Sequence, residues 1–363
     1  FRSEGAPRPL YVIEGKSPQD VVRSLASLTG TIEMPPRWAL GYHQCRYSYF
    51  PEAQVRDIAR NFRDRDIPAD VVWFDIDYMN EYRVFTWDAK SFPDPKKLNA
   101  DLHAMGFHTV WMIDPGIKAE PGFSVYDAGT SKDAWVKNAE NEVYKGEVWP
   151  GWCVFPDYTR ADVRTWWSEL YPAFMATGVD GVWNDMNEPA VFNVKSKTMP
   201  EDNIHVGGNL DGYGTLVKGP HLQYHNVYGM LMAKGTRDGI LAANPDKRPF
   251  VLTRAGYLGS HRYAATWTGD NSAEWDDVEQ SISMILNLGL SGQPFSGPDI
   301  GGFNGNGDAA LFSRWMGLGS LMPFSRGHTG KGNSQKEPWA FGPEVEKTAR
   351  TALQRRYRLL PYF

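Results

Sequence analysis

Short apolar runs alternate with amphipathic helical patterns along most of the chain. The runs are rich in β-branched and aromatic residues and are short enough to be buried strands of a parallel sheet. Eight such strands, with helical patterns lying between them, predict the α/β class and a (β/α)8 TIM barrel. The predicted strands are residues 38–44, 70–77, 109–114, 179–185, 249–254, 264–270, 294–300 and 319–325.

The helical patterns between these strands place apolar residues three to four positions apart. A doubly wound sheet is the alternative fold, but no glycine-rich phosphate turn follows the first strand. The sequence therefore favours the barrel. The predicted helices are residues 51–64, 96–105, 160–177, 222–238, 276–287, 309–317 and 343–360.

Two long segments interrupt the repeat, and both follow the carboxyl ends of predicted strands. Residues 115–158 come after the third strand and residues 186–219 after the fourth. Barrel active sites are built from loops at this end of the strands, and long loops there are usually functional. We therefore expect both loops to border a site.

The opening segment does not fit the repeat. Residues 10–15 resemble the last strand of another unit, and residues 17–28 resemble a linking helix capped by Ser17 with Pro18 at its first position. We expect residues 1–37 to be the end of a preceding β-domain with a linking helix, and residues 38–363 to be the barrel. Flanking β-domains are expected to be absent from this chain and to contact the barrel in a longer protein.

Charge and composition narrow the class of partner. The net charge is −5 and no basic run occurs, which disfavours nucleic acid. No apolar stretch reaches the roughly 18 residues that span a bilayer. The two cysteines lack metal-ligand spacing, and we expect two buried thiols rather than a disulfide. The 14 Trp, 17 Tyr and 18 Phe suit a site for sugars, whose flat C–H faces pack on aromatic rings, although large barrels also bury many aromatics.

Acidic residues fall at the ends of five predicted strands: Asp75, Asp114, Asp185, Asp270 and Asp299. Acids are depleted in strands and costly in a core, so helix capping alone does not explain this pattern. A ring of carboxylates suits either hard-metal binding or stabilisation of a cationic transition state. The calcium-loop motif is missing, and the acids alternate with Trp and Phe. We therefore expect no metal and favour glycosidic chemistry.

Several segments carry a family resemblance. VWNDMNEP at residues 182–189 resembles the nucleophile signature of glycoside hydrolase family 31, and the other segments match that family in the same order. The resemblance covers about residues 10–363, and the joint match is far more specific than any single motif. The other matching segments are DIDYM at 75–79, VWPG at 148–151, FPDY at 155–158, Arg254, RYA at 262–264, WTGDN at 267–271, PDIGGF at 298–303 and PFSRGH at 323–328.

The resemblance implies a role for each matching position. Asp185 would be the nucleophile that forms a covalent glycosyl intermediate, Asp270 the acid/base, and Glu188 a supporting acid in the catalytic set. The remaining positions would line the sugar pocket, with polar groups on hydroxyls and apolar groups as walls. These are Asp75, Ile76, Asp114, Trp149, Trp183, Met186, Arg254, Trp267, Asp299, Phe303 and His328.

The implied activity is that of a retaining exo-acting α-glucosidase, with an α-glucoside or α-glucan as substrate and no cofactor. The form of residues 75–79 resembles the α-glucosidase branch, and Asn187 with Glu188 argues for hydrolysis over a lyase. An α-glucosyltransferase of the same family, a metal-dependent barrel enzyme and a carbohydrate-binding barrel without catalysis are the alternatives. Neither linkage preference nor cellular compartment follows from the residues.

Overall fold

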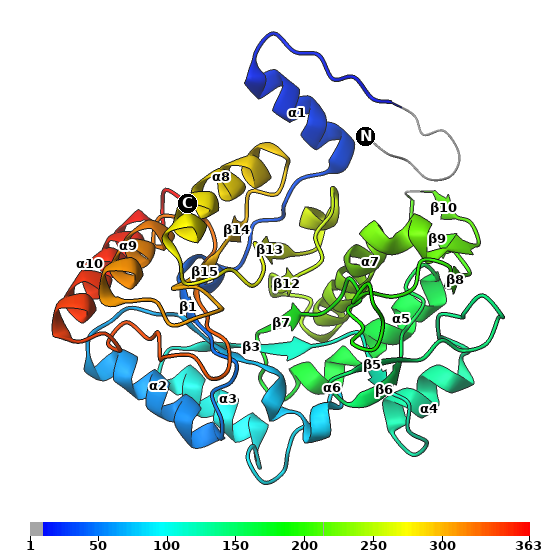
Figure 1. Cartoon of the computed structure of the whole chain (residues 1–363), viewed down its shortest axis with the longest axis horizontal. Coiled ribbons are helices and arrows are strands. Elements are labelled where there is room, and N and C mark those ends of the chain that lie inside the picture. The colour runs from blue at the N-terminus through cyan, green and yellow to red at the C-terminus, as the bar shows by residue number, and fades with distance from the viewer. Residues whose placement is uncertain (1–9, 213) are drawn as a thin grey trace.

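The central sheet is parallel, and its strands form a ring surrounded by helices (Figure 1). The computed structural model describes residues 10–212 and 214–363. The order around the sheet is β14-β13-β12-β7-β3-β2-β1-β16-β15. The bounds are β1 Tyr42–Gln44, β2 Val71–Phe74, β3 His108–Ile113, β7 Gly181–Asn184, β12 Val251–Thr253, β13 Ala265–Trp267, β14 Ser296–Gly297, β15 Asp299–Ile300 and β16 Ser325–Gly327.

The ring closes because β14 and β15 are two halves of one predicted strand, residues 294–300. They are separated by Pro298, which has no N–H to donate to a sheet ladder. The first half pairs with β13 and the second with β16, so the same chain segment joins the two ends of the sheet. The predicted eight-stranded (β/α)8 barrel is therefore confirmed.

The helices follow the strands in the predicted order. In α2, for example, Val55, Ile58, Ala59 and Phe62 form the buried face, as their spacing predicts. The bounds are α1 Pro18–Thr29, α2 Glu52–Asp64, α3 Pro95–Ala104, α4 Ser124–Ser131, α5 Ala161–Glu169, α6 Tyr171–Met175, α7 His221–Ala243, α8 Trp275–Leu290, α9 Ala309–Gly319 and α10 Pro343–Leu359.

Two predicted elements are wrong in detail. The single helix over residues 160–177 is two helices, α5 and α6, because Pro172 at the start of α6 cannot continue the hydrogen-bond ladder of α5. The eighth strand was expected at residues 319–325 but covers Ser325–Gly327. Gly319 instead ends α9, and the apolar run that follows it is a turn that leads into the strand.

The described residues of both predicted insertions form small sheets of their own. The first contains α4 and a three-stranded sheet in the order β4-β6-β5 (Ile117–Lys118, Gly151–Val154, Gly146–Val148). In the second, β8 (Ile204–His205) pairs with β11 (Gly219–Pro220), and β9 (Gly208–Asn209) pairs with β10 (Thr215–Leu216). The long loops after the third and fourth barrel strands are therefore confirmed.

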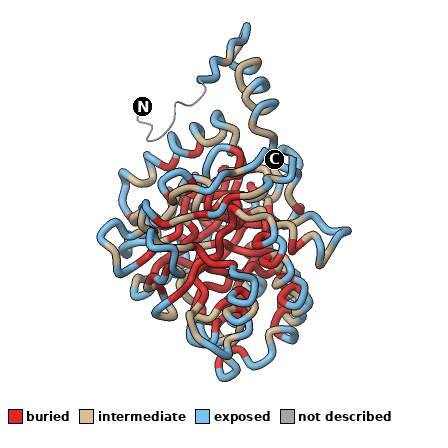
Figure 2. Tube along the Cα trace, turned by 90° about the vertical axis from the view of Figure 1, so that its right-hand side faces the viewer, coloured by how far each residue is buried: buried red, intermediate tan, exposed pale blue. Residues whose placement is uncertain are grey.

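In the described part of the opening segment, the predicted linking helix forms and residues 10–15 are irregular. Helix α1 forms with Ser17 as its N-cap, yet it has no buried residue and projects away from the barrel (Figure 2). Residues 10–15 form no strand, and Leu10 and Val12 are 88% and 76% exposed. A strand needs a partner for its backbone groups, and none of the described residues supplies one. The remaining part of that prediction, residues 1–9, lies outside the described residues.

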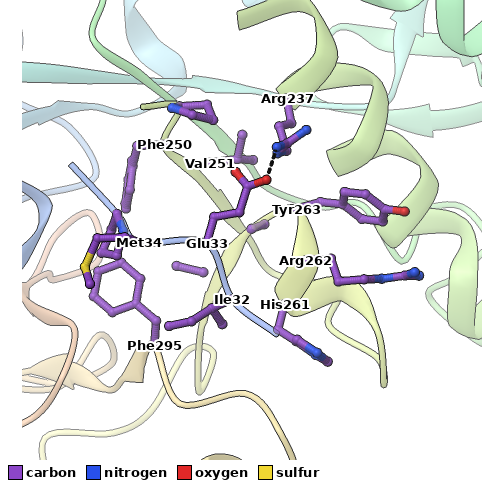
Figure 3. A pocket seen from close by; sticks show the side chains of 14 residues that line it. Ile32, Glu33, Met34, Arg237, Phe250, Val251, His261, Arg262, Tyr263 and Phe295 are labelled. Carbon is purple, nitrogen blue, oxygen red and sulfur yellow. Dashed lines mark hydrogen bonds and ion pairs between the residues drawn. The ribbon is translucent and has the colours of Figure 1, made fainter. Parts of the chain in front are cut away.

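The linker after α1 runs beneath the amino-terminal ends of β12 and β13. Figure 3 shows a cavity there, lined by Ile32, Met34 and Phe295, with Glu33 paired to Arg237. Its volume is about 40 Å³, which is too small for a sugar ring. The acids lie at the carboxyl-terminal ends of the strands, so this cavity is at the opposite end of the barrel.

No helix among the described residues has the length and hydropathy that crossing a bilayer requires.

Arg356 in α10 links the first barrel strand to the last through hydrogen bonds. The side chain is fully buried. Its Nε donates to the carbonyls of Leu40 and Gly41, which precede β1. Its Nη1 and Nη2 donate to three carbonyls that precede β16, at 2.6–3.1 Å; these belong to Ser320, Met322 and Pro323. Burial lowers the pKa of this guanidinium to about 10, so it stays charged at neutral pH.

Replacing Arg356 with Met should destabilise the fold by about 3 kcal/mol, because buried carbonyls at both strands lose their donor. The free energy of unfolding in urea is the measurement. Arg355→Met is the matched control, since Arg355 lies on the same helix and makes one exposed hydrogen bond. Equal stability of the two variants would contradict the role given to Arg356.

Candidate active site

The five predicted acids all lie at the carboxyl-terminal mouth of the barrel. Asp75 follows β2, Asp114 follows β3 and Asp185 follows β7. Asp299 opens β15, and Asp270 lies in the loop after β13. Asp75, Asp114 and Asp299 are buried, whereas Asp270 is exposed. Because the carboxyl ends of parallel strands meet at one edge, the strand order alone brings these side chains to one site.

Asp185 and Glu188 share one guanidinium, that of Arg254 at the end of β12. Arg254 donates through Nε and Nη2 to the two carboxylate oxygens of Glu188, at 2.8 and 2.9 Å. Its Nη1 lies 3.4 Å from Oδ1 of Asp185, and its Nη2 lies 3.1 Å from Sδ of Met186. Glu188 therefore has both oxygens engaged, while Asp185 keeps a looser ion pair. The bidentate bond to Glu188 thus holds the guanidinium of Arg254 beside Asp185.

Burial raises the pKa of Asp185 to about 6, against the opposing charge of Arg254. The charges of Asp270 and Glu188 raise the pKa of Asp185 further. Desolvation disfavours the ionised form of any carboxyl group, and Arg254 offsets only part of that cost. Asp185 is therefore ionised at neutral pH and begins to take up a proton in mildly acidic solution.

Asp270 has a different environment. Its residue surface is exposed at the mouth, yet enough protein surrounds the carboxyl group for desolvation to raise its pKa. The charges of Arg254 and Arg326 oppose this rise, and that of Glu188 adds to it. A carboxyl group with a raised pKa that remains open to solvent can both donate a proton and take one up again.

Asp75, His328 and Phe303 lie together. Nε2 of His328 is 3.9 Å from Oδ2 of Asp75, and the rings of His328 and Phe303 are 5.0 Å apart. Burial and the nearby Arg326 hold the pKa of His328 well below its usual range, so the imidazole is neutral. Burial, followed by the charge of Asp185, raises the pKa of Asp75 well above its usual range. Both side chains are therefore set up for hydrogen bonds rather than for a strong ion pair.

Asp114 and Asp299 each present a buried oxygen that has no hydrogen-bond partner among the described residues. These atoms are Oδ1 of Asp114 and Oδ2 of Asp299. Burial raises the pKa of Asp299 to about 7, with Arg326 opposing, and raises the pKa of Asp114 well above its usual range. Unsatisfied buried oxygens are rare, and at the mouth of a barrel they indicate a polar ligand.

Apolar candidates pack beneath and around these acids. Trp183 and Trp267 meet edge to face at 5.6 Å, and both are buried, as are Ile76 and Met186. Trp149 differs, because it lies on the β5–β6 turn, is 36% exposed and contacts Phe192 and Tyr47. Its ring neighbours among the described residues are all aromatic, so Trp149 belongs to the rim of the mouth and not to the buried cluster.

The sequence interpretation missed two residues of this cluster. Arg326 in β16 donates from Nη2 to Oδ1 of Asp299 at 2.6 Å, and Cys45 after β1 lies beside Asp75 and His328. Arg326 could have been noticed because an arginine inside a buried strand, Ser325–Gly327, is unusual. Cys45 offered no such signal, since its position depends on the closure of the ring.

Both cysteines are free and buried, as predicted. Two groups of potential metal ligands converge among the described residues. Cys45, Asp75 and His328 form one inside the site, and His103, His108 and Asp180 form the other at the amino-terminal end of β3. In each group the potential ligand atoms lie within 4.8 Å of one another.

Comparison with known proteins agrees with this geometry. The chain is 46% identical over 362 residues to "Alpha-glucosidase 2" of Bacillus thermoamyloliquefaciens, covering 100% of this chain and 45% of that protein. It is 40% identical over 367 residues to human "Neutral alpha-glucosidase C", covering 100% of this chain and 39% of that one. The chain thus spans less than half the length of these curated relatives.

Solved structures give the same result. A crystal structure described as a family 31 alpha-glucosidase from Bacteroides thetaiotaomicron superposes with a TM-score of 0.89 at 54% identity. The match covers 99% of this chain and 58% of that chain. Residues 32–363 match the "Glycosyl hydrolases family 31 TIM-barrel domain". The chain belongs to glycoside hydrolase family 31, and residues 32–363 form the TIM-barrel domain of that family.

Proposed function

We propose that the protein is a retaining, exo-acting α-glucosidase that hydrolyses terminal α-linked glucose from oligosaccharides or α-glucans. The observation that carries the proposal is the pair Asp185 and Asp270, which occupy one mouth but have different surroundings. Asp185 is partly buried beside a guanidinium, and Asp270 is open to solvent with a raised pKa. Family 31 relatives named as α-glucosidases supply the substrate class.

In the proposed first step, Asp185 attacks the anomeric carbon while Asp270 gives its proton to the departing glycosidic oxygen. The C–O bond to the leaving group breaks, and a bond from Asp185 to the sugar forms. In the second step, Asp270 takes a proton from water, which displaces Asp185 and releases glucose with retained configuration. Carboxylates and water suffice for both steps, so the proposal includes no cofactor.

The remaining residues are proposed to bind and orient the sugar. Oxygens of Asp75, Asp114 and Asp299, with the neutral His328, would engage hydroxyl groups. Arg254 would hold Asp185 in place, and Glu188 would act by holding Arg254, since both of its oxygens are engaged there. Indoles and aliphatic groups would enclose the ring face; these are Ile76, Trp183, Met186, Trp267 and Phe303, with Trp149 at the rim.

The decisive experiment is turnover of nitrophenyl α-glucoside, set beside the α-xyloside and the α-galactoside, by the full-length protein. We expect hydrolysis of the α-glucoside with release of α-glucose, and no loss of activity on chelation. Transfer products exceeding free glucose at high substrate concentration would establish the α-glucosyltransferase instead. Binding without turnover would favour the carbohydrate-binding barrel. Flanking β-domains stay a prediction, for which the longer relatives leave room.

Replacing Asp185 with Asn should lower kcat for nitrophenyl α-glucoside by roughly 10⁴-fold, because the amide cannot attack the anomeric carbon. Steady-state kinetics at a fixed pH measure the effect. Asp276→Asn is the control, since Asp276 is an exposed acid on the first turn of α8 and is not one of the strand-end acids. Turnover by the Asp185 variant within a few-fold of the wild type would remove the nucleophile from the proposal.

Replacing Asp270 with Ala should slow hydrolysis of a disaccharide far more than that of a nitrophenyl glucoside, whose leaving group needs no proton. Added azide should restore part of the nitrophenyl rate and yield α-glucosyl azide, because a small anion attacks the intermediate without base assistance. Product analysis by NMR checks this. Equal losses on both substrates, with no azide product, would mean that Asp270 does not transfer the proton.

The pH profile follows from the pKa of Asp185. Below about pH 6 the carboxyl group is protonated and cannot attack, so kcat/KM should fall as pH drops through that value. Arg254 opposes the rise of this pKa, so Arg254→Gln should move the acid limb to higher pH. Initial rates from pH 4 to 9 measure both. An acid limb unchanged by the substitution would show that another group titrates there.

A further inference from the structure

Arg326 lies in β16 and is completely buried, at 0% exposure. One of its nitrogens, Nη2, donates to Oδ1 of Asp299 at 2.6 Å. Its Nε and Nη1 are buried and have no hydrogen-bond partner among the described residues. The guanidinium instead faces the rings of Trp73, Trp183 and Trp267, each 4.9 Å from its centre. The guanidinium of Arg326 therefore packs against aromatic faces instead of oxygen acceptors.

Such a charge is an expensive way to stabilise a core. A buried ion pair is often no better than apolar residues of similar volume, and unpaired N–H groups add a further desolvation cost. Arg356 shows the contrast within the same barrel, because each of its donor nitrogens reaches a carbonyl. Packing alone therefore does not explain Arg326.

Its contacts connect both proposed catalytic acids. Trp183 lies in β7, two residues before Asp185, and Trp267 ends β13, three residues before Asp270. Asp299, the hydrogen-bonded partner, belongs to the neighbouring strand β15. One side chain in the eighth strand thus contacts the fourth, sixth and seventh strands immediately below the mouth.

The charge of Arg326 acts on the same set of groups. It lowers the pKa of Asp75, Asp270 and Asp299, against the rise that burial causes in each. It also lowers the pKa of His328, which it helps to keep neutral. The other cation at the mouth, Arg254, is held by Glu188 and is the main opposing charge for Asp114, Asp185 and Asp270. Arg326 is the fully buried guanidinium that opposes the rise in pKa at Asp75 and Asp299.

We propose that Arg326 is a positioning residue of the sugar pocket. It holds Asp299 by Oδ1, so that Oδ2 stays free to accept a hydrogen bond from a sugar hydroxyl, and it fixes the indoles beside Asp185 and Asp270. The inference rests on the proposed function, because it takes the ligand of Asp299 to be the terminal glucose. Arg326 itself does not touch the sugar.

The test compares Arg326→Met with Arg356→Met, a second fully buried arginine at the opposite end of the barrel. Both variants should be less stable than the wild type. Per folded molecule, Arg326→Met should lose about 100-fold in kcat/KM on nitrophenyl α-glucoside, with KM raised and kcat lowered, whereas Arg356→Met should retain wild-type values. Arg326→Lys, which keeps the charge but not the fork, should recover part of the loss.

A double-mutant cycle with Asp299→Asn tests whether Arg326 acts through Asp299. The double variant should be within about threefold of Asp299→Asn alone, because the interaction is already lost. Thermal unfolding and circular dichroism confirm that each variant is folded. If either methionine variant does not fold, the Arg326→Lys and Arg356→Lys pair carries the same comparison.

Glucose binding, followed by calorimetry, is a second readout that does not need turnover. Arg326→Met should bind glucose about tenfold more weakly than the wild type, and Arg356→Met should bind it equally well. Unchanged kinetics and binding in folded Arg326→Met, or effects that multiply in the double variant, would overturn the inference alone. A wild type that turns over no α-glucoside would instead contradict the proposed function, and glucose binding would then decide the role of Arg326.

Discussion

The site depends on the desolvation of carboxyl groups at the ends of buried barrel strands. Burial is the largest cause of the raised pKa at Asp75, Asp114, Asp185 and Asp299, and cations offset only part of it. These carboxyl groups come together because the carboxyl ends of the barrel strands surround one mouth. The positive charges of Arg254 and Arg326 oppose the rise in these pKa values and so favour the ionised form of the carboxyl groups.

The two arginines offset the desolvation of the carboxyl groups in different ways. Arg254 is partly exposed and uses its fork on Glu188, so its charge reaches Asp185 through a 3.4 Å ion pair. Arg326 is buried among indoles, and its charge reaches several acids through a medium with little water. Electrostatic interactions are stronger in such surroundings, so a single guanidinium can act on several carboxyl groups.

The hydrogen bonds that close the barrel and the acids of the candidate site lie at opposite ends of the strands. At the amino-terminal ends of the strands, Arg356 ties β1 to β16 and the linker packs under β12. At the carboxyl-terminal ends, acids with unsatisfied oxygens point to a polar ligand. Hydrogen-bonded groups therefore hold the ring closed at one end, while unsatisfied oxygens at the other end remain able to accept hydrogen bonds.

Much of this was fixed by the sequence itself. Alternating periodicity predicted the eight units, and acids at strand ends predicted Asp75, Asp114, Asp185, Asp270 and Asp299 as one set, because both patterns are local. Long-range contacts were decided only by the tertiary structure. The pairing of Asp185 with Arg254 and of Asp299 with Arg326, the joining of the sheet through β14 and β15, and the indoles around Arg326 all depend on ring closure. Residues 10–15 show the converse, because an apolar run with strand character remains irregular where no described strand pairs with it.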